Sequence, residues 1–182
     1  PKGIAIPSWS ITVNHGATNY REAHGLEGYH FVKWEIIKGN ALIADTNAAS
    51  TSLILENGDA EIKPVFNINK YNISIVTQGN GTATILPKKE IYTHGDTVII
   101  TATPANGNNF TEWSSSVTST ANPLMIIIKS NMDITANFAV NLYSVTINTG
   151  YNGTVSPSAN QRLPYGSSIK TVATPITGYH FL

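Results

Sequence analysis

Histidine is the residue type in this chain that first suggests chemistry. The sequence contains five histidines, and His15, His24 and His30 lie close together, a grouping that could place imidazole ligands around a metal ion. Such a site also needs ligands that converge across strands and further carboxylate or histidine partners, which the similar segment around His94 lacks. The sequence therefore predicts no metal site, and it offers no motif for a cofactor.

Catalysis would need a different set of residues. Hydrolytic sites use paired carboxylates in a cleft, or a nucleophile beside a base and its orienting group. Glu22, Glu27 and Glu35 have only a loose counterpart, Glu112, in the similar segment that follows. Serine and threonine are abundant, but no Gly-x-Ser-x-Gly elbow or glycine-rich phosphate loop occurs. We therefore expect a protein that is not an enzyme.

The three tryptophans fall into two groups. Trp34 and Trp113 occupy the same position in two similar segments, and large rings at a recurring position are expected in a core. Trp9 aligns instead with Lys88 or Lys89, a position typical of solvent. An exposed tryptophan can stack on a sugar or anchor an interface. Trp9 is therefore a candidate ligand contact, with packing against a neighbouring copy as the alternative.

Composition restricts the partners. Eleven basic residues balance eleven acidic ones, and only 12% of residues are charged, so no basic field would attract nucleic acid. No cysteine is present, which excludes disulfides and thiolate sites. No apolar stretch approaches the length of a membrane span. We expect no membrane insertion within these residues, and any secretion signal or anchor to lie outside them.

Internal repetition organises the chain. Residues Tyr71–Ile75 recur as Tyr143–Ile147, and Thr101–Pro104 as Val172–Pro175, at offsets of 71 to 72 residues. An earlier, partial copy is marked by matching glycines and aromatic residues: His15 and Gly16 with His94 and Gly95, Gly28 with Gly107, Phe31 with Phe110, and Trp34 with Trp113. The sequence thus predicts repeat 1 over 1–69 without its first strand, a complete repeat 2 over 70–141, and repeat 3 over 142–182, truncated after its third strand.

Each repeat is expected to be all-β, because apolar residues alternate with polar ones at period two and no stretch has helical periodicity. Asn80-Gly81 and Asn152-Gly153 predict that each copy opens with a hairpin, and the spacing of Phe110 and Trp113 predicts a bulge. The expected core consists of Tyr71, Ile73, Ile75, Val98, Ile100, Phe110, Trp113, Ile126, Ile134, Phe138, Phe31, Trp34, Phe66, Tyr143, Val145 and Ile147.

Repeat 1 departs from repeat 2 in three places. Residues 35–52 form a connection several residues longer than its counterpart at 114–123, which predicts a longer loop. Gly25 stands where Pro104 and Pro175 stand, and Pro64 is expected to interrupt the last strand of the copy.

The recurring pattern resembles the divergent internalin B-type repeat. It is carried by Tyr71, Gly81, Gly95, Ala102, Thr103, Pro104, Gly107, Phe110, Trp113, Asn122, Pro123, Ile134, Ala136 and Phe138. The resemblance covers essentially the whole chain and implies small β-grasp-like or sandwich-like modules, strung along secreted or surface-anchored bacterial proteins. It implies no catalytic activity.

These observations favour a cell-surface or extracellular stalk, spacer or adhesin segment whose partners are neighbouring repeats or copies of itself. One alternative is a module that binds a host or matrix glycan or protein through Trp9 and the 35–52 loop. Another is a head-to-tail fibre subunit, because the two incomplete end copies could exchange strands with other chains.

Overall fold

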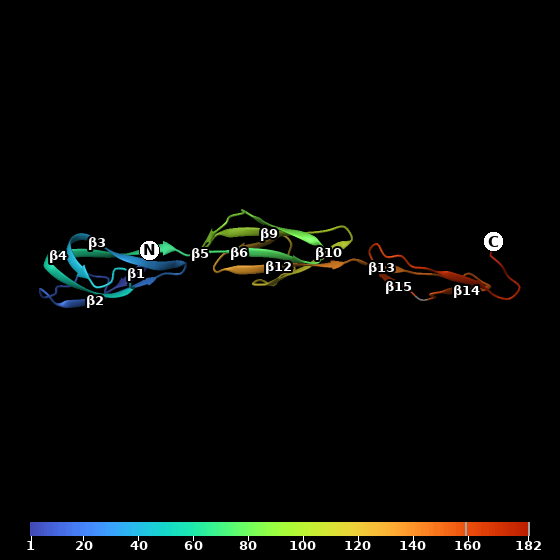
Figure 1. Cartoon of the computed structure of the whole chain (residues 1–182), viewed down its shortest axis with the longest axis horizontal. Coiled ribbons are helices and arrows are strands. Elements are labelled where there is room, and N and C mark those ends of the chain that lie inside the picture. The colour runs from blue at the N-terminus through green and yellow to red at the C-terminus, as the bar shows by residue number, and fades with distance from the viewer. Residues whose placement is uncertain (159, 182) are drawn as a thin grey trace. The chain divides into compact units, whose positions relative to one another are not determined.

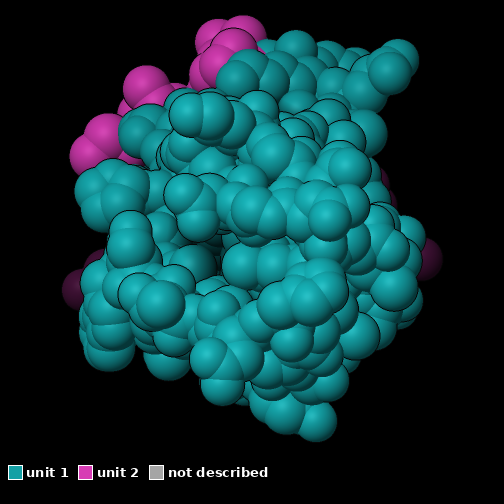
Figure 2. Space-filling model, turned by 90° about the vertical axis from the view of Figure 1, so that its left-hand side faces the viewer, with its two compact units in different colours: residues 1–73, 88–98, 126–132 teal, residues 74–87, 99–125, 133–182 magenta. Residues whose placement is uncertain are grey.

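Every regular element in the described chain is a β-strand (Figure 1). The computed structural model describes residues 1–158 and 160–181, which contain no helix, and the predicted all-β class is therefore confirmed. None of these residues forms a helix able to span a membrane. The chain divides into two compact units, coloured separately in Figure 2. Unit 1 comprises residues 1–73, 88–98 and 126–132, and unit 2 comprises residues 74–87, 99–125 and 133–182.

The strands follow one another with short connections. In chain order they are β1 (Gly3–Ile6), β2 (Thr18–Gly25), β3 (Tyr29–Ile43), β4 (Ser50–Ile68), β5 (Lys70–Tyr71), β6 (Ile73–Gln78), β7 (Gly81–Leu86), β8 (Tyr92–Thr93), β9 (Thr97–Pro104), β10 (Asn108–Ser115), β11 (Leu124–Ile127), β12 (Met132–Val140), β13 (Leu142–Val145), β14 (Gly153–Ser156), β15 (Gln161–Pro164) and β16 (Val172–Pro175).

In unit 1, β1 to β4 form one antiparallel sheet in the order β1-β2-β4-β3. The prediction of a loop over residues 35–52 is wrong for most of that segment. Residues 35–43 continue β3, residues 50–52 begin β4, and only residues 44–49 connect the two strands. The added residues pair with each other across β3 and β4, for example Ile43 with Leu53. Paired strands satisfy backbone groups that an open loop would leave to water, so the insertion lengthens a hairpin.

Pro64 does not interrupt β4, contrary to expectation. It lies opposite Trp34 in the β3–β4 pair, and the Trp34 N–H donates to the Thr46 carbonyl at 2.7 Å instead of crossing to β4. Opposed residues in an antiparallel ladder bond to each other or both point away. The missing N–H of Pro64 therefore falls on the edge of β4 that faces away from β3, where proline removes no ladder bond to β3.

The core of unit 1 contains a trio of aromatic rings. Trp34 and Phe66 are buried together with Ala23, and the Phe31 ring lies 5.6 Å from Trp34 and 6.1 Å from Phe66 between centroids. The buried Trp34 indole N–H donates to the Ala48 carbonyl at 3.0 Å. This hydrogen bond offsets the cost of burying the donor.

Unit 2 repeats that arrangement. Phe110 lies 5.2 Å from Trp113 and 6.0 Å from Phe138 between centroids, and the Trp113 indole N–H donates to the Ala121 carbonyl at 2.9 Å. The register of β10 and β12 shifts between Phe110 and Glu112, which confirms the predicted bulge. The bulge turns both rings to one side despite their three-residue spacing.

The strands β6, β7 and β9 to β12 form two three-stranded sheets, β10-β12-β6 and β11-β9-β7. The predicted hairpin at Asn80-Gly81 is therefore wrong, because β6 and β7 enter different sheets. Gly79 adopts φ of +87° at this turn, and a Cβ on Gly81 would lie 2.5 Å from the Phe138 ring. The Asn-Gly pair therefore lies where the chain crosses from one sheet to the other. Because Gly81 has no side chain, it leaves room for the Phe138 ring.

The last four described strands form two two-stranded sheets, β13-β15 and β14-β16. Gly153 pairs with Pro175 as Gly81 pairs with Pro104 and Gly3 with Gly25, so one register recurs along the chain. Tyr143, expected in the core, is 52% exposed. Among the described strands β13 pairs only with β15, and a sheet of two strands buries little side-chain surface.

The burial of the other expected core residues varies. Val98, Ile100, Trp113, Ile134, Phe138, Trp34 and Phe66 are buried, whereas Tyr71, Ile73, Ile75, Phe110, Ile126, Phe31, Val145 and Ile147 are half-buried. Two further residues, Tyr92 and Ile128, are 2% and 0% exposed and were not among the expected core. The alternation through Ile126 extends to Ile128 and was the signal for the latter.

Candidate functional site

Asn69, between β4 and β5, is the centre of a compact contact in unit 1. Its N–H donates to the Gly28 carbonyl at 2.8 Å, and its own carbonyl accepts from the His94 N–H at 2.9 Å. A Cβ on Gly28 would lie 2.4 Å from the His94 ring, so the imidazole rests directly against the glycine backbone. We call Gly28, Asn69 and His94 the first joint.

The same contact recurs in unit 2. The Asn141 N–H donates to the Gly107 carbonyl at 2.8 Å, and the Asn141 carbonyl accepts from the Tyr165 N–H at 2.9 Å. A Cβ on Gly107 would lie 2.0 Å from the Tyr165 ring. Gly107, Asn141 and Tyr165 form the second joint, and each member lies 71 to 79 residues after its counterpart in the first.

Each joint has a polar contact at the far end of the ring. In the second joint the Asn106 amide N–H donates to the Tyr165 hydroxyl at 2.8 Å. In the first joint Glu27, the residue before the glycine, lies 3.6 Å from His94 Nε2 and 3.0 Å from Lys129 Nζ. The Lys129 ammonium, through its hydrogen bond and charge, and then His94 lower the pKa of the Glu27 carboxyl.

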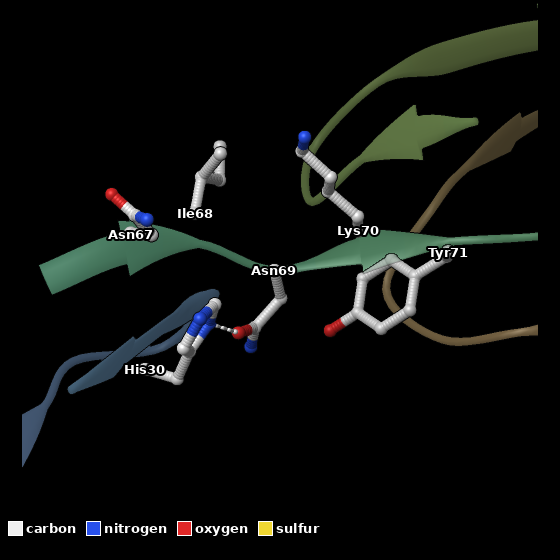
Figure 3. A pocket seen from close by; sticks show the side chains of 6 residues that line it. All are labelled: His30, Asn67, Ile68, Asn69, Lys70 and Tyr71. Atoms are coloured by element: carbon white, nitrogen blue, oxygen red, sulfur yellow. Dashed lines mark hydrogen bonds between the residues drawn. The ribbon is translucent and has the colours of Figure 1, made fainter. Parts of the chain in front are cut away.

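The first joint borders a pocket of about 670 Å³ lined by residues 67–71 and His30 (Figure 3). The Asn69 side-chain oxygen lies 2.7 Å from His30 Nδ1. In Figure 3 the side chains of Asn69 and Tyr71 point to the side of the strand on which His30 lies, whereas Lys70 and Ile68 point away. The Tyr71 ring is 6.1 Å from the His94 ring, and Tyr143 is 6.4 Å from Tyr165 in the second joint.

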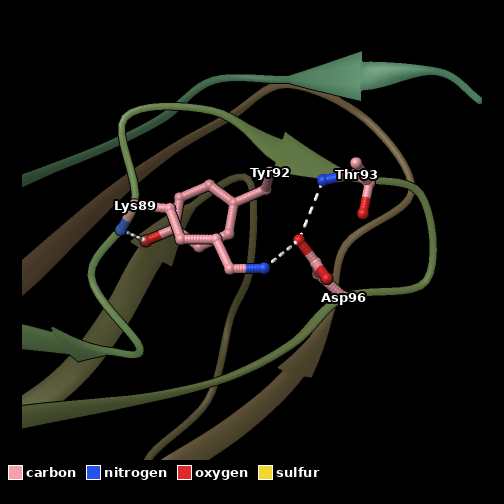
Figure 4. Close-up of polar contacts among 4 residues, drawn as sticks. All are labelled: Lys89, Tyr92, Thr93 and Asp96. Carbon is pink, nitrogen blue, oxygen red and sulfur yellow. Dashed lines mark hydrogen bonds and ion pairs between the residues drawn. The ribbon is translucent and has the colours of Figure 1, made fainter.

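A second polar cluster lies between β7 and β9 (Figure 4). Asp96 Oδ2 accepts from Lys89 Nζ and from the Thr93 N–H, both at 2.8 Å. The Tyr92 hydroxyl accepts from the Lys89 N–H at 3.2 Å. The Lys89 hydrogen bond, followed by the Thr93 N–H, lowers the pKa of the Asp96 carboxyl. The cluster fixes the loop that leads into the His94 turn.

Replacing Lys89 with alanine is expected to raise the pKa of the Asp96 carboxyl toward its ordinary value, because the largest favourable contact of the carboxylate is removed. A carboxyl group whose pKa is lower in the folded than in the unfolded state stabilises the fold at pH values above its unfolded-state pKa. This contribution is lost as the pH falls through the folded-state pKa. The variant should therefore lose less stability on acidification. Carboxyl NMR titration measures the change, with the adjacent Lys88→Ala as control. An unchanged Asp96 titration in Lys89→Ala would contradict the assignment.

The carboxylates singled out in the sequence do not converge. Glu22 lies 3.5 Å from His24, and Glu35 contacts Lys33 at 3.0 Å and Lys63 at 3.5 Å. Among the described residues, no three histidine, cysteine, aspartate or glutamate side chains are grouped as a metal would require. His15, His24 and His30 therefore form no such group.

Trp9, the candidate ligand contact from the sequence, lies at the surface of unit 1. It is 70% exposed and borders a pocket of about 910 Å³ in unit 1 that is also lined by Asn19, Arg21, Asp59 and Glu61. An exposed indole beside amide, guanidinium and carboxylate groups could stack on and hydrogen-bond a polar ring.

Sequence reasoning did not identify the joints. His15-Gly16, His94-Gly95 and Tyr165-Gly166 recur along the chain, as do Gly28, Gly107 and Gly178. The matches of His15-Gly16 with His94-Gly95 and of Gly28 with Gly107 marked the alignment of copies, but nothing in one copy shows that its glycine meets the ring of the next. The contact is made between residues that lie 58 to 66 positions apart.

Three consecutive segments of the chain, residues 7–70, 71–142 and 143–182, match the family model described as the divergent InlB B-repeat domain. Neither a curated protein nor a solved structure matches the chain. Gly28 and Asn69 fall in the first matched segment, His94 and Gly107 in the second, and Tyr165 in the third. Each joint therefore connects two successive matched segments.

Proposed function

This chain belongs to the divergent InlB B-repeat family, and from that premise we propose that it is a non-catalytic spacer that sets the distance between other parts of a bacterial surface protein. The family indicates a repeat module of a surface or extracellular protein. The spacer role, the division into repeats at 1–69, 70–141 and 142–182, and neighbouring repeats as partners are our proposal.

The observation that carries this proposal is the recurrence of the joint. A flexible linker would leave successive repeats free to reorient. Here the linking asparagine is held at both its N–H and its carbonyl, and a ring of one repeat lies against a glycine of the repeat before it. Two hydrogen bonds and a ring contact at each boundary restrict rotation between neighbours. Restricted rotation is what a spacer of defined reach requires.

Distance measurements across the second joint test the proposal. Because the chain has no cysteine, spin labels can be attached uniquely at Thr118→Cys and Ser168→Cys, which lie at exposed positions on either side of the joint in unit 2. We expect a single narrow distance distribution by pulsed electron paramagnetic resonance. A broad distribution, similar to that of an unrestrained linker, would rule out the spacer mechanism.

Glycan binding is the second candidate function, and the exposed Trp9 beside its polar pocket supports it. An oligosaccharide that stacks on the indole should quench tryptophan fluorescence, and Trp9→Ala should abolish the binding. Tyr151→Ala is the matched control, because Tyr151 is fully exposed and does not line this pocket. The candidate fails if a glycan array detects no ligand, or if a detected ligand binds the Trp9→Ala chain equally well.

A further inference from the structure

The two joints hold different rings in the same place. A Cβ on Gly28 would lie 2.4 Å from Cδ2 and 2.5 Å from Cγ of His94, and one on Gly107 would lie 2.0 Å from Cδ1 and 2.3 Å from Cγ of Tyr165. The part of each ring nearest its own backbone therefore rests on the glycine. The phenol extends further beyond the glycine than the imidazole, because its hydroxyl projects from the far end of a larger ring.

The residue before each glycine starts from an equivalent backbone position. Both turns are closed by a hydrogen bond from the residue after the glycine to the carbonyl two residues before it, at 2.9 Å in the first joint and 3.0 Å in the second. The two glycines have φ of +81° and +74°. Glu27 and Asn106 therefore extend toward the ring from corresponding places, and the glutamate side chain is longer by one carbon.

The lengths of the two partners compensate each other. In the first joint the longer side chain meets the shorter ring, with Glu27 Oε1 3.6 Å from His94 Nε2. In the second joint the shorter side chain meets the longer ring, and the Asn106 amide N–H donates to the Tyr165 hydroxyl at 2.8 Å. An asparagine at position 27 would end about 1.5 Å short of the glutamate. A tyrosine at position 94 would put its hydroxyl where the Glu27 carboxylate lies.

The imidazole in the first joint has one polar neighbour. His94 Nδ1 is buried and has no hydrogen-bond partner among the described residues, so Glu27 supplies the polar contact at the other ring nitrogen, Nε2. The same carboxylate accepts from Lys129 Nζ at 3.0 Å, which holds it beside the ring. The His94 side chain is only 16% exposed, and a polar atom that loses its partner at such a position destabilises the contact.

We propose that the residue before each joint glycine and the ring that rests on that glycine are a matched pair that selects the neighbouring repeat. A Glu-Gly pair fits a histidine of the next repeat, and an Asn-Gly pair fits a tyrosine. The glycine and the ring meet in either combination, and the matched pair sets how firmly the joint closes. The proposal rests on the joints that carry the spacer role, and it adds that each joint has a preferred neighbour.

A double-mutant cycle in the first joint tests the match. Glu27→Asn shortens the side chain and His94→Tyr lengthens the ring, so each alone should lower the folding equilibrium constant roughly fivefold or more in urea denaturation. The double variant recreates the pair of the second joint and should recover most of this loss. Glu27→Gln is the conservative variant, because it keeps the length and removes the charge. It should lose much less stability than Glu27→Asn.

Two results would overturn the matched pair. One is a double variant in which the effects of Glu27→Asn and His94→Tyr simply add. The other is a Glu27→Gln chain as unstable as Glu27→Asn, because charge and not length would then decide the contact. The label distances across the second joint test the spacer role separately. A broad distribution in the original chain would end that role, whereas the denaturation cycle would still decide whether the two side chains are matched.

Discussion

Replacing Trp113 with alanine is expected to lower the free energy of unfolding by about 3–5 kcal/mol, because it leaves a large cavity in a packed core. Trp113 is completely buried, lies 5.2 Å from Phe110 between ring centroids, and donates its indole N–H to Ala121. The substitution removes the ring and leaves the Ala121 carbonyl without this donor. The loss is large against the roughly 5–15 kcal/mol by which native domains are stable.

Chemical denaturation followed by circular dichroism measures this effect. Trp9→Ala is the control, because it deletes the same side chain at a position that is 70% exposed, and surface substitutions usually change stability by about 0.5 kcal/mol or less. If Trp113→Ala and Trp9→Ala unfolded at the same denaturant concentration, the assignment of Trp113 to the core would be wrong.

The second large effect is expected at the joint. In Gly107→Ala the new Cβ would lie 2.0 Å from the Tyr165 ring, so the ring must leave its place. An alanine at φ of +74° adds about 1–2 kcal/mol of backbone strain. We expect the distance distribution between labels at 118 and 168 to become broad, while the aromatic core around Trp113 stays folded.

Gly166→Ala separates the contact from the strain. Gly166 lies beside Tyr165 and has φ of +78°, but a Cβ there would meet no atom of the described residues within 4 Å. This control should keep a narrow distance distribution despite a similar loss of stability. If Gly107→Ala also kept a narrow distribution, the ring contact would not be what restricts the second joint.

The sequence was sufficient for the features that depend on local pattern. Period-two alternation predicted strands, and repetition placed Trp34 and Trp113 at equivalent core positions, where the structure buries both rings. The odd spacing of Phe110 and Trp113 predicted the bulge. These properties arise within one strand or by comparison of two copies, and they need no knowledge of how layers are arranged.

The features that could not be predicted depend on where a strand goes after a turn. Asn80-Gly81 is compatible with a hairpin, but β6 and β7 enter different sheets, and Phe138, far along the chain, packs over Gly81. Likewise, residues 35–43 resemble a loop insertion until their partners in β4 are known. The joints could not be predicted because glycine and ring come from different repeats, and neither has an unusual sequence environment on its own.

The positions of the ring and the glycine of a joint within each copy also affect how the number of copies in the gene can change. In every copy a histidine or tyrosine stands thirteen residues before the glycine that corresponds to Gly28 of the first joint. The pairs are His15 and Gly28, His94 and Gly107, and Tyr165 and Gly178. Unequal crossing-over between copies in register therefore adds or deletes whole modules while leaving a ring and a glycine at every new boundary. The length of the protein can vary by recombination without redesign of the contacts that connect its parts.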